Sequence, residues 1–143
     1  MNEEIINYIK SQRVCVLAVE MLDGSPHAST VHFVETEDPM VFLFETYRDY
    51  RKCEPLFGRE MSRASIVIGC DEDTMKTLQL DGEVSLVKKE DNKIYDLYFT
   101  KFPNKKEKSE KMGDKFVLFT FKAKWWRFTD WTKPEGKLII TSE

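Results

Sequence analysis

The stretch Thr77-Leu78-Gln79-Leu80-Asp81-Gly82-Glu83-Val84-Ser85-Leu86 decides the fold class of this chain. Its apolar residues stand at every second position, and the alternation passes through Gly82 without a change of phase. A period of two predicts a β-strand with one buried face. Asp81-Gly82 can also close a two-residue hairpin. The unbroken phase instead favours one long strand bent at the glycine, a device that β-barrels use.

Other strand-like segments lie on both sides of this stretch. They cover residues 14–20, 27–35, 40–44, 64–70, 116–121 and 124–131, with 137–141 as a short additional candidate. Helices are expected after Asn2, which can cap a first helix, between Asp91 and Pro103, and over 105–111. Six or seven strands with few, short helices predict a mainly β fold, a small antiparallel β-barrel.

Length and charge narrow the function classes. A chain of 143 residues is expected to form a single domain, 1–143. A net charge of -3 argues against nucleic-acid binding, which favours a basic face. We expect neither a membrane span nor a signal peptide, and therefore a cytoplasmic protein. The three cysteines are predicted to be reduced thiols, and together with two histidines they lack the spacing of a metal site.

The stretch most suggestive of a functional site is Glu45-Thr46-Tyr47-Arg48-Asp49-Tyr50-Arg51-Lys52. Thr46 followed by Asp49 fits a helix-start capping pattern, and Pro55 would end or kink such a helix near Glu54. Three cations on one side of a helix start suit a phosphate. The alternative is a charged, solvated helix face with no ligand, because a basic helix start is a weak motif.

The order of elements from about Val14 to Trp131 resembles the FMN-binding split-barrel family that includes pyridoxamine 5'-phosphate oxidase. In that family one strand passes along the flavin, and Thr30-Val31-His32-Phe33-Val34-Glu35 occupies its place here. The next strand ends in a threonine that precedes Ser-Arg-Lys, whose cations hold the FMN phosphate. Thr46 stands at that threonine, and Tyr50-Arg51-Lys52 stands at Ser-Arg-Lys with the same spacing.

Two further family motifs are present with changes. Thr77 stands where the family has a glutamine near the flavin, and Gln79 follows two residues later on the same strand face. Either could bond the flavin ring. The oxidases carry Arg-Leu-His-Asp-Arg on a C-terminal strand, where this chain reads Arg127-Phe128-Thr129-Asp130-Trp131. The histidine engages the substrate in true oxidases, so Thr129 argues against vitamin B6 oxidation. Thr30 and Glu35 also replace an arginine and a lysine of the family.

The resemblance implies a six- to seven-stranded antiparallel split barrel, an FMN cofactor and a homodimer with the flavin at the subunit interface. The residues expected to contact the cofactor are Val31, His32, Phe33, Thr46, Tyr47, Arg51, Lys52, Thr77, Gln79, Arg127 and Trp131. Backbone groups of His32 and Phe33 and the Thr46 hydroxyl would face the ring or the ribityl chain. No catalytic residue is assigned. His32 could donate a proton, although a lone histidine on a strand is more often simply packed or exposed.

Three functions are compatible with this reading. The first is an oxidoreductase that moves electrons between a nicotinamide donor, NADH or NADPH, and an unknown small acceptor. The second is a non-enzymatic FMN-binding protein or electron carrier. The third keeps the barrel but binds haem or a deazaflavin, and the shortage of axial ligands beyond His32 argues against haem.

Overall fold

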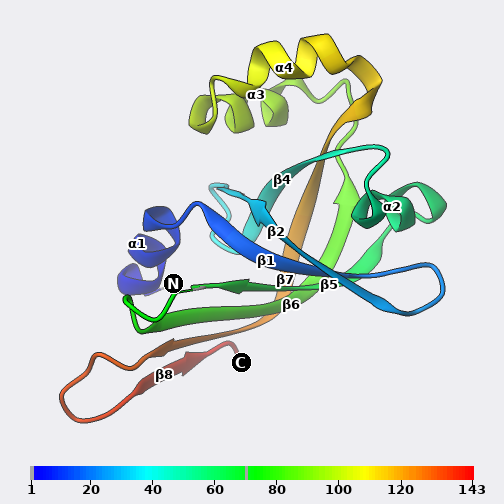
Figure 1. Ribbon diagram of the computed structural model, residues 1–143. Helices are drawn as coiled ribbons and strands as arrows, with labels where there is room; N and C mark the ends of the chain where they lie inside the picture. The colour runs from blue at the N-terminus through cyan, green and yellow to red at the C-terminus, as the bar shows by residue number, and fades with distance from the viewer. Residues whose placement is uncertain (1, 70) are drawn as a thin grey trace.

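A computed structural model describes residues 2–69 and 71–143 of the chain. Its strands form one curled antiparallel sheet in the order β2-β1-β5-β6-β7-β4-β3, and β8 pairs with the far end of β7 (Figure 1). Within the described residues this order ends at β2 on one side and at β3 on the other, so the sheet curls without closing. The strands are β1 (Val14–Glu20), β2 (Pro26–His32), β3 (Val34–Glu35), β4 (Val41–Tyr47), β5 (Ser62–Ile68), β6 (Lys76–Leu86), β7 (Phe116–Asp130) and β8 (Leu138–Thr141). The mainly β, antiparallel split-barrel prediction is confirmed.

The helices are short and lie at the margins of the sheet (Figure 1). They are α1 (Glu3–Ser11), η1 (Arg51–Cys53), α2 (Glu54–Gly58), α3 (Asn92–Lys101), α4 (Lys105–Met112) and η2 (Gly113–Lys115). The predicted cap at Asn2 is confirmed, because its side chain accepts a hydrogen bond from Glu4 N, and the helix expected after Asp91 is capped by the Asp91 side chain, which accepts a hydrogen bond from Ile94 N. No helix in residues 2–69 and 71–143 is long and apolar enough to cross a membrane.

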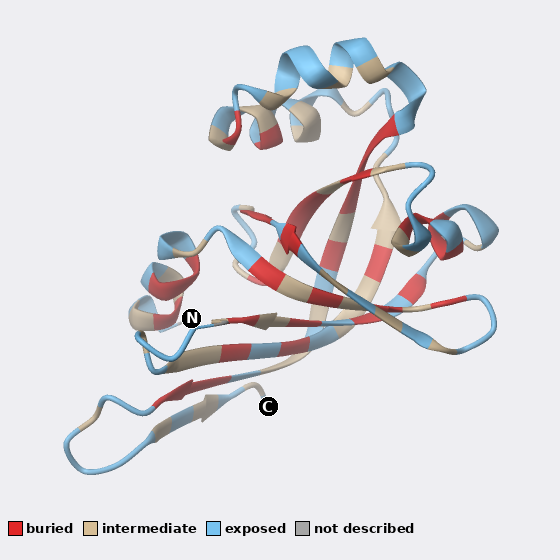
Figure 2. Ribbon diagram, viewed as in Figure 1, coloured by how far each residue is buried: buried red, intermediate tan, exposed pale blue. Residues whose placement is uncertain are grey.

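The curled sheet wraps around an aromatic core (Figure 2). The rings of Phe44 and Phe119 stack there at a centroid distance of 5.1 Å. Cys15 and Cys53 are buried in the same cluster, and burial raises the pKa of the Cys53 thiol to about 11, so this thiol stays protonated at neutral pH. The third cysteine, Cys70, lies outside the described residues.

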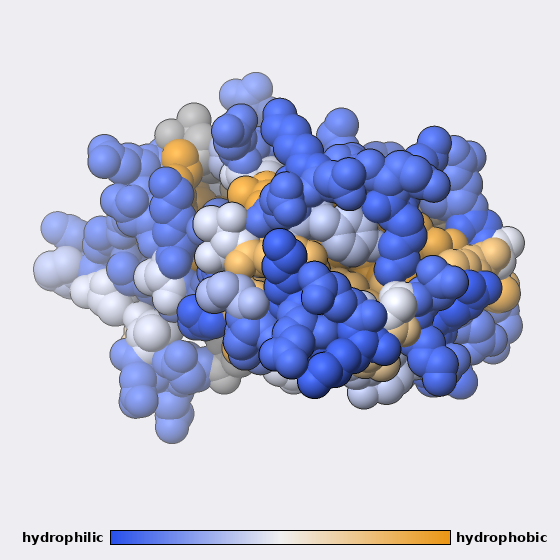
Figure 3. Space-filling model, turned by 90° about the horizontal axis from the view of Figure 1, so that it is seen from above, coloured by the Kyte–Doolittle hydropathy of each residue, from blue (hydrophilic) through white to orange (hydrophobic). Residues whose placement is uncertain are grey.

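A second apolar cluster joins α3 to the outer side of β4 and β7. Its fully enclosed members include Tyr98 of α3, Leu43 of β4 and Phe116 of β7. Helix α4 adds no buried residue, and the surface above α3 and α4 is largely hydrophilic (Figure 3). The two helices are therefore held to the sheet mainly through α3.

Strand β6 runs without interruption through Gly82, which confirms the long-strand interpretation and excludes the hairpin. The register with β7 shifts at this point, since Asp81 lies opposite Trp125 whereas Gly82 lies opposite Ala123. Lys124 is thus the extra residue of a β-bulge. A Cβ atom on Gly82 would stand only 2.1 Å from the carbonyl oxygen of Lys122, so glycine allows the two backbones to approach at the bend.

Two strand predictions were wrong, and both fail at an irregularity of the ladder. The segments 116–121 and 124–131 are one 15-residue strand, β7, because the bulge at Lys124 moves the inward-facing residues from odd to even positions. The segment 27–35 divides into β2 and β3, because the chain changes partner there: β2 pairs with β1, as far as a 3.0 Å bond from Phe33 N–H to the Arg13 carbonyl, whereas β3 pairs with β4.

Candidate functional site

The predicted helix start at Thr46 is wrong. Thr46 belongs to β4, where it pairs with Val117 of β7, and its side chain is only 3% exposed. The chain then turns and forms η1 and α2, with Pro55 in the first turn of α2. Proline is tolerated in the first helical turn because the N–H that it lacks would be unpaired there. Pro55 therefore begins a helix here and does not end one.

The three cations after Thr46 diverge. The Arg48 guanidinium lies 4.4 Å from the centroid of the Phe57 ring, and Lys52 Nζ lies 5.0 Å from the centroid of the Tyr50 ring. Arg51 is exposed beside a hollow of about 170 Å³ that Asp23 also lines. The expectation that all three share one side of a helix turn is therefore wrong. We call residues 48–52 the cation turn.

Lys52 is the cation of this turn that is partly withdrawn from water. Burial lowers the pKa of Lys52, while the negative charge of Glu45 acts in the opposite direction. Among the described residues, no carboxylate lies within ion-pair distance of Arg48, Arg51 or Lys52. A half-buried ammonium without such a partner gains from a bound anion.

The strand that the resemblance places along the flavin presents fewer groups to a ligand than expected. The side chains of Val31 and Phe33 are buried in the core, so they cannot reach a ligand at the surface. Phe33 N–H is already bonded to Arg13. His32 is exposed, and its ring lies 5.4 Å from the ring of Phe102. Since β2 contacts η1, His32 lies on the strand that borders the cation turn.

The other expected residues lie on the outer face of β6 and β7. Gln79 is directly opposite Arg127, and Thr77 is directly opposite Thr129. Arg127 is exposed, with its guanidinium 5.5 Å from the Trp125 ring, and Trp131 is 46% exposed. Strands β1 and β5 separate β2 from β6 in the sheet. One chain therefore presents the expected contacts as two groups, one at β2, β4 and η1 and one on β6 and β7.

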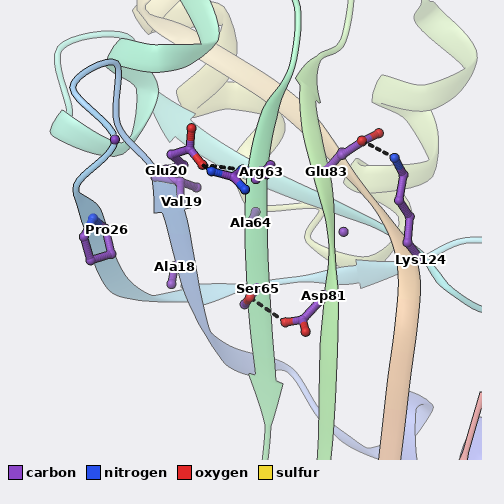
Figure 4. A pocket seen from close by; sticks show the side chains of 12 residues that line it. Ala18, Val19, Glu20, Pro26, Arg63, Ala64, Ser65, Asp81, Glu83 and Lys124 are labelled. Atoms are coloured by element: carbon purple, nitrogen blue, oxygen red, sulfur yellow. Dashed lines mark hydrogen bonds and ion pairs between the residues drawn. The ribbon is translucent and has the colours of Figure 1, made fainter.

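A larger hollow, of about 670 Å³, opens on the outer face of β1, β5 and β6 (Figure 4). Three polar pairs cross it, namely the ion pairs Arg63–Glu20 and Lys124–Glu83 and a 2.6 Å hydrogen bond from Ser65 to Asp81. None of the sequence-predicted contact residues lines this hollow. Its only signal in the sequence is that Asp81 and Glu83 share the strand face of Gln79.

Arg59, which follows α2, is a structural residue that the sequence analysis missed. Its guanidinium donates to the carbonyl oxygens of Glu20 at 2.7 Å and of Met21 at 3.0 Å, and to the Ser62 hydroxyl at 2.8 Å. These bonds tie α2 to the end of β1. Because η1 runs directly into α2, Arg59 also anchors the cation turn.

Replacing Arg59 by alanine is expected to lower the free energy of unfolding by about 2 kcal/mol, because two carbonyl oxygens and the Ser62 hydroxyl lose a charged donor. Urea denaturation measures this change. The control is Arg63→Ala, which removes a cation that is 81% exposed and should change stability by less than about 0.5 kcal/mol. Equal effects of the two substitutions would show that Arg59 anchors nothing.

Comparison with known proteins gives a family for this chain. Residues 1–130 match the family model described as pyridoxamine 5'-phosphate oxidase. No curated protein matches the chain significantly.

Solved structures share the fold at low sequence identity. A Clostridium acetobutylicum protein related to general stress protein 26 of B. subtilis aligns with TM-score 0.72 and 14% identity, over 100% of this chain and 96% of that one. A putative pyridoxamine 5'-phosphate oxidase from Listeria innocua aligns with TM-score 0.65 and 19% identity, over 88% and 95%. The haem-storage protein HutZ from Vibrio cholerae aligns with TM-score 0.65 and 16% identity, over 85% and 88%. With the family match covering most of its length, the chain belongs to the pyridoxamine 5'-phosphate oxidase-like family of split-barrel proteins.

Proposed function

We propose that this protein binds FMN and acts as an oxidoreductase that passes electrons from a nicotinamide donor to a small acceptor. The observation that carries the proposal is the cation turn. Arg51 and Lys52 occupy the phosphate position of the family motif, and no described carboxylate lies within ion-pair distance of them.

The residues present fit a phosphorylated cofactor. Arg51 and Lys52 would hold the phosphate by charge-assisted hydrogen bonds. The anion would also offset the desolvation of the Lys52 ammonium, which burial now disfavours. FMN, when bound, supplies the electron chemistry by accepting a hydride from the nicotinamide donor and returning the electrons to an acceptor.

A homodimer with the flavin at its interface accounts for the separation of the two groups of contacts. A two-fold axis can place β6 and β7 of one copy against the cation turn of the other. The outer sheet face supports such contact because it carries apolar residues that are partly exposed. Examples are Val14, which is 36% exposed, and the directly opposed pair Val16 and Val67.

The substrate differs from that of the B6 oxidases in this proposal. Thr129 replaces the substrate-binding histidine of the family motif, and its side chain is buried. Arg127 keeps its place in the motif and remains exposed. We therefore propose a small acceptor other than pyridoxamine 5'-phosphate, with Arg127 available to an anionic group on it.

An absorption spectrum followed by an anaerobic titration tests the proposal. The purified protein, mixed with FMN and passed through a desalting column, is expected to keep the two flavin bands in the blue and near-ultraviolet. Adding NADPH or NADH should bleach them. Bands that persist under excess donor would instead identify a flavin carrier, and a haem spectrum with no flavin retention would contradict FMN binding.

A further inference from the structure

We infer that Lys108 of α4 and the ring of Tyr50 form a second anion site beside the cation turn, which takes the 2'-phosphate and the adenine of a nicotinamide donor. This inference rests on the proposed function, since it names which donor the flavin site uses. It predicts that NADPH, which carries the 2'-phosphate, is preferred to NADH.

Four side chains form a continuous row across the surface between η1 and α4. Lys52 Nζ lies 5.0 Å from the Tyr50 ring centroid, and the Tyr50 and Tyr47 rings meet edge to face with centroids 4.9 Å apart. Lys108 Nζ lies 4.9 Å from the Tyr47 ring centroid. The row therefore carries a cation at each end and two aromatic rings between them.

Lys108 is available for a ligand, unlike two other lysines of its helix. Lys105 forms an ion pair with Glu45, and Lys111 forms one with Glu107 at 3.0 Å. Among the described residues, no carboxylate lies within ion-pair distance of Lys108. Its contact with the Tyr47 hydroxyl raises the pKa of Lys108, so the ammonium is charged at neutral pH.

The arrangement suits two phosphates from two ligands. Each ammonium stands over a different ring, so Lys52 serves the cofactor phosphate and Lys108 serves the 2'-phosphate of the donor, and lysine binds each phosphate as a point charge. The Tyr50 ring is 49% exposed and can stack on a base. The adenylate half of NADPH carries a base together with phosphates on the 5' and 2' positions of its ribose. NADH has a hydroxyl at the 2' position and would leave Lys108 without an anion.

The position of Lys108 also explains why it does not share the FMN phosphate with Lys52. Lys52 belongs to the cation turn at the end of β4, whereas Lys108 lies on α4, and the two tyrosine rings stand between them. The cofactor phosphate would occupy Arg51 and Lys52, and the donor would approach from the side of α4.

Calorimetric titration of the flavin-free protein with 2',5'-ADP tests this site without any redox reaction. We expect the full chain to bind 2',5'-ADP, with about tenfold weaker binding in Lys108→Ala and weaker binding in Tyr50→Leu. The matched control is Lys106→Ala, an exposed lysine of the same helix, which should bind like the unmodified protein. Binding of 5'-AMP, which lacks the 2'-phosphate, should be equal in all the lysine variants.

Kinetics of the FMN-loaded protein give a second readout. In Lys108→Ala, kcat/KM for NADPH should fall about tenfold while kcat/KM for NADH and the Kd for FMN stay unchanged. Two results would overturn the inference: 2',5'-ADP binding that is absent or insensitive to Lys108→Ala, or a weakened FMN affinity in that variant, which would place Lys108 on the cofactor phosphate. If the protein retains no flavin, the proposed function fails, yet the 2',5'-ADP titration still decides the anion site.

Discussion

Replacing Arg51 and Lys52 together by alanine is expected to weaken FMN binding by at least about 100-fold, because each cation contributes a charge-assisted hydrogen bond to the phosphate. Riboflavin, which has no phosphate, should bind the unmodified protein and the double variant equally. Fluorescence titration with the two flavins measures both affinities. The comparison separates loss of the phosphate contact from damage to the ring site.

The control for this experiment removes two cations from elsewhere on the surface. Lys106→Ala with Lys137→Ala makes the same change in net charge, and both side chains are exposed. FMN affinity should stay within about twofold, since surface charges beyond a Debye length act weakly at physiological salt. If the Arg51/Lys52 double variant binds FMN as tightly as this control, the cation turn is not the phosphate site and the proposed function loses its main support.

Replacing Gly82 by alanine should destabilise the fold by roughly 3 kcal/mol, since the new Cβ would meet backbone that cannot rotate away. The nearest atoms are the carbonyl oxygen of Lys122 at 2.1 Å and its carbonyl carbon at 2.9 Å. Strand β7 would have to move away from β6 at the bulge, weakening the pairing that bends the sheet. Urea denaturation and the melting temperature report the loss.

Gly58→Ala is the matched control for the same chemical change. The three atoms nearest to a Cβ there are side-chain atoms of Leu22, the first at 2.7 Å, and the half-exposed Leu22 side chain has room to turn aside. We expect a change in the free energy of unfolding of less than about 0.5 kcal/mol. Equal destabilisation by the two substitutions would mean that the close approach of β6 and β7 at Gly82 is not important for the fold.

The pairing of β6 with β7 explains why the sequence predicted β6 correctly and β7 incorrectly. Alternation in β6 stayed in phase through Gly82 because the extra residue of the bulge lies on β7. The same bulge reversed the phase of β7, and the pattern was read as two strands. A bulge is a property of a strand pair, so the sequence of one strand shows only its consequence.

The cation turn was also predicted only in part. The order Thr46, Arg51, Lys52 and the family resemblance identified the turn, but local capping rules assigned Thr46 to a helix that does not exist. Thr46 is held in β4 by its pairing with Val117, a residue far along the chain. Long-range pairing therefore outweighed the local capping preference at this position.

By itself, the sequence determined the antiparallel sheet, its bent central strand and the residues available to bind an anion, because these follow from side-chain period, glycine and charge. Only the tertiary structure decided that Val31 and Phe33 are buried, that the expected contacts form two separate groups, and that Lys108 stands beside Tyr47. These facts depend on which distant segments pack together, and that packing is set by burial of the whole core rather than by any local pattern.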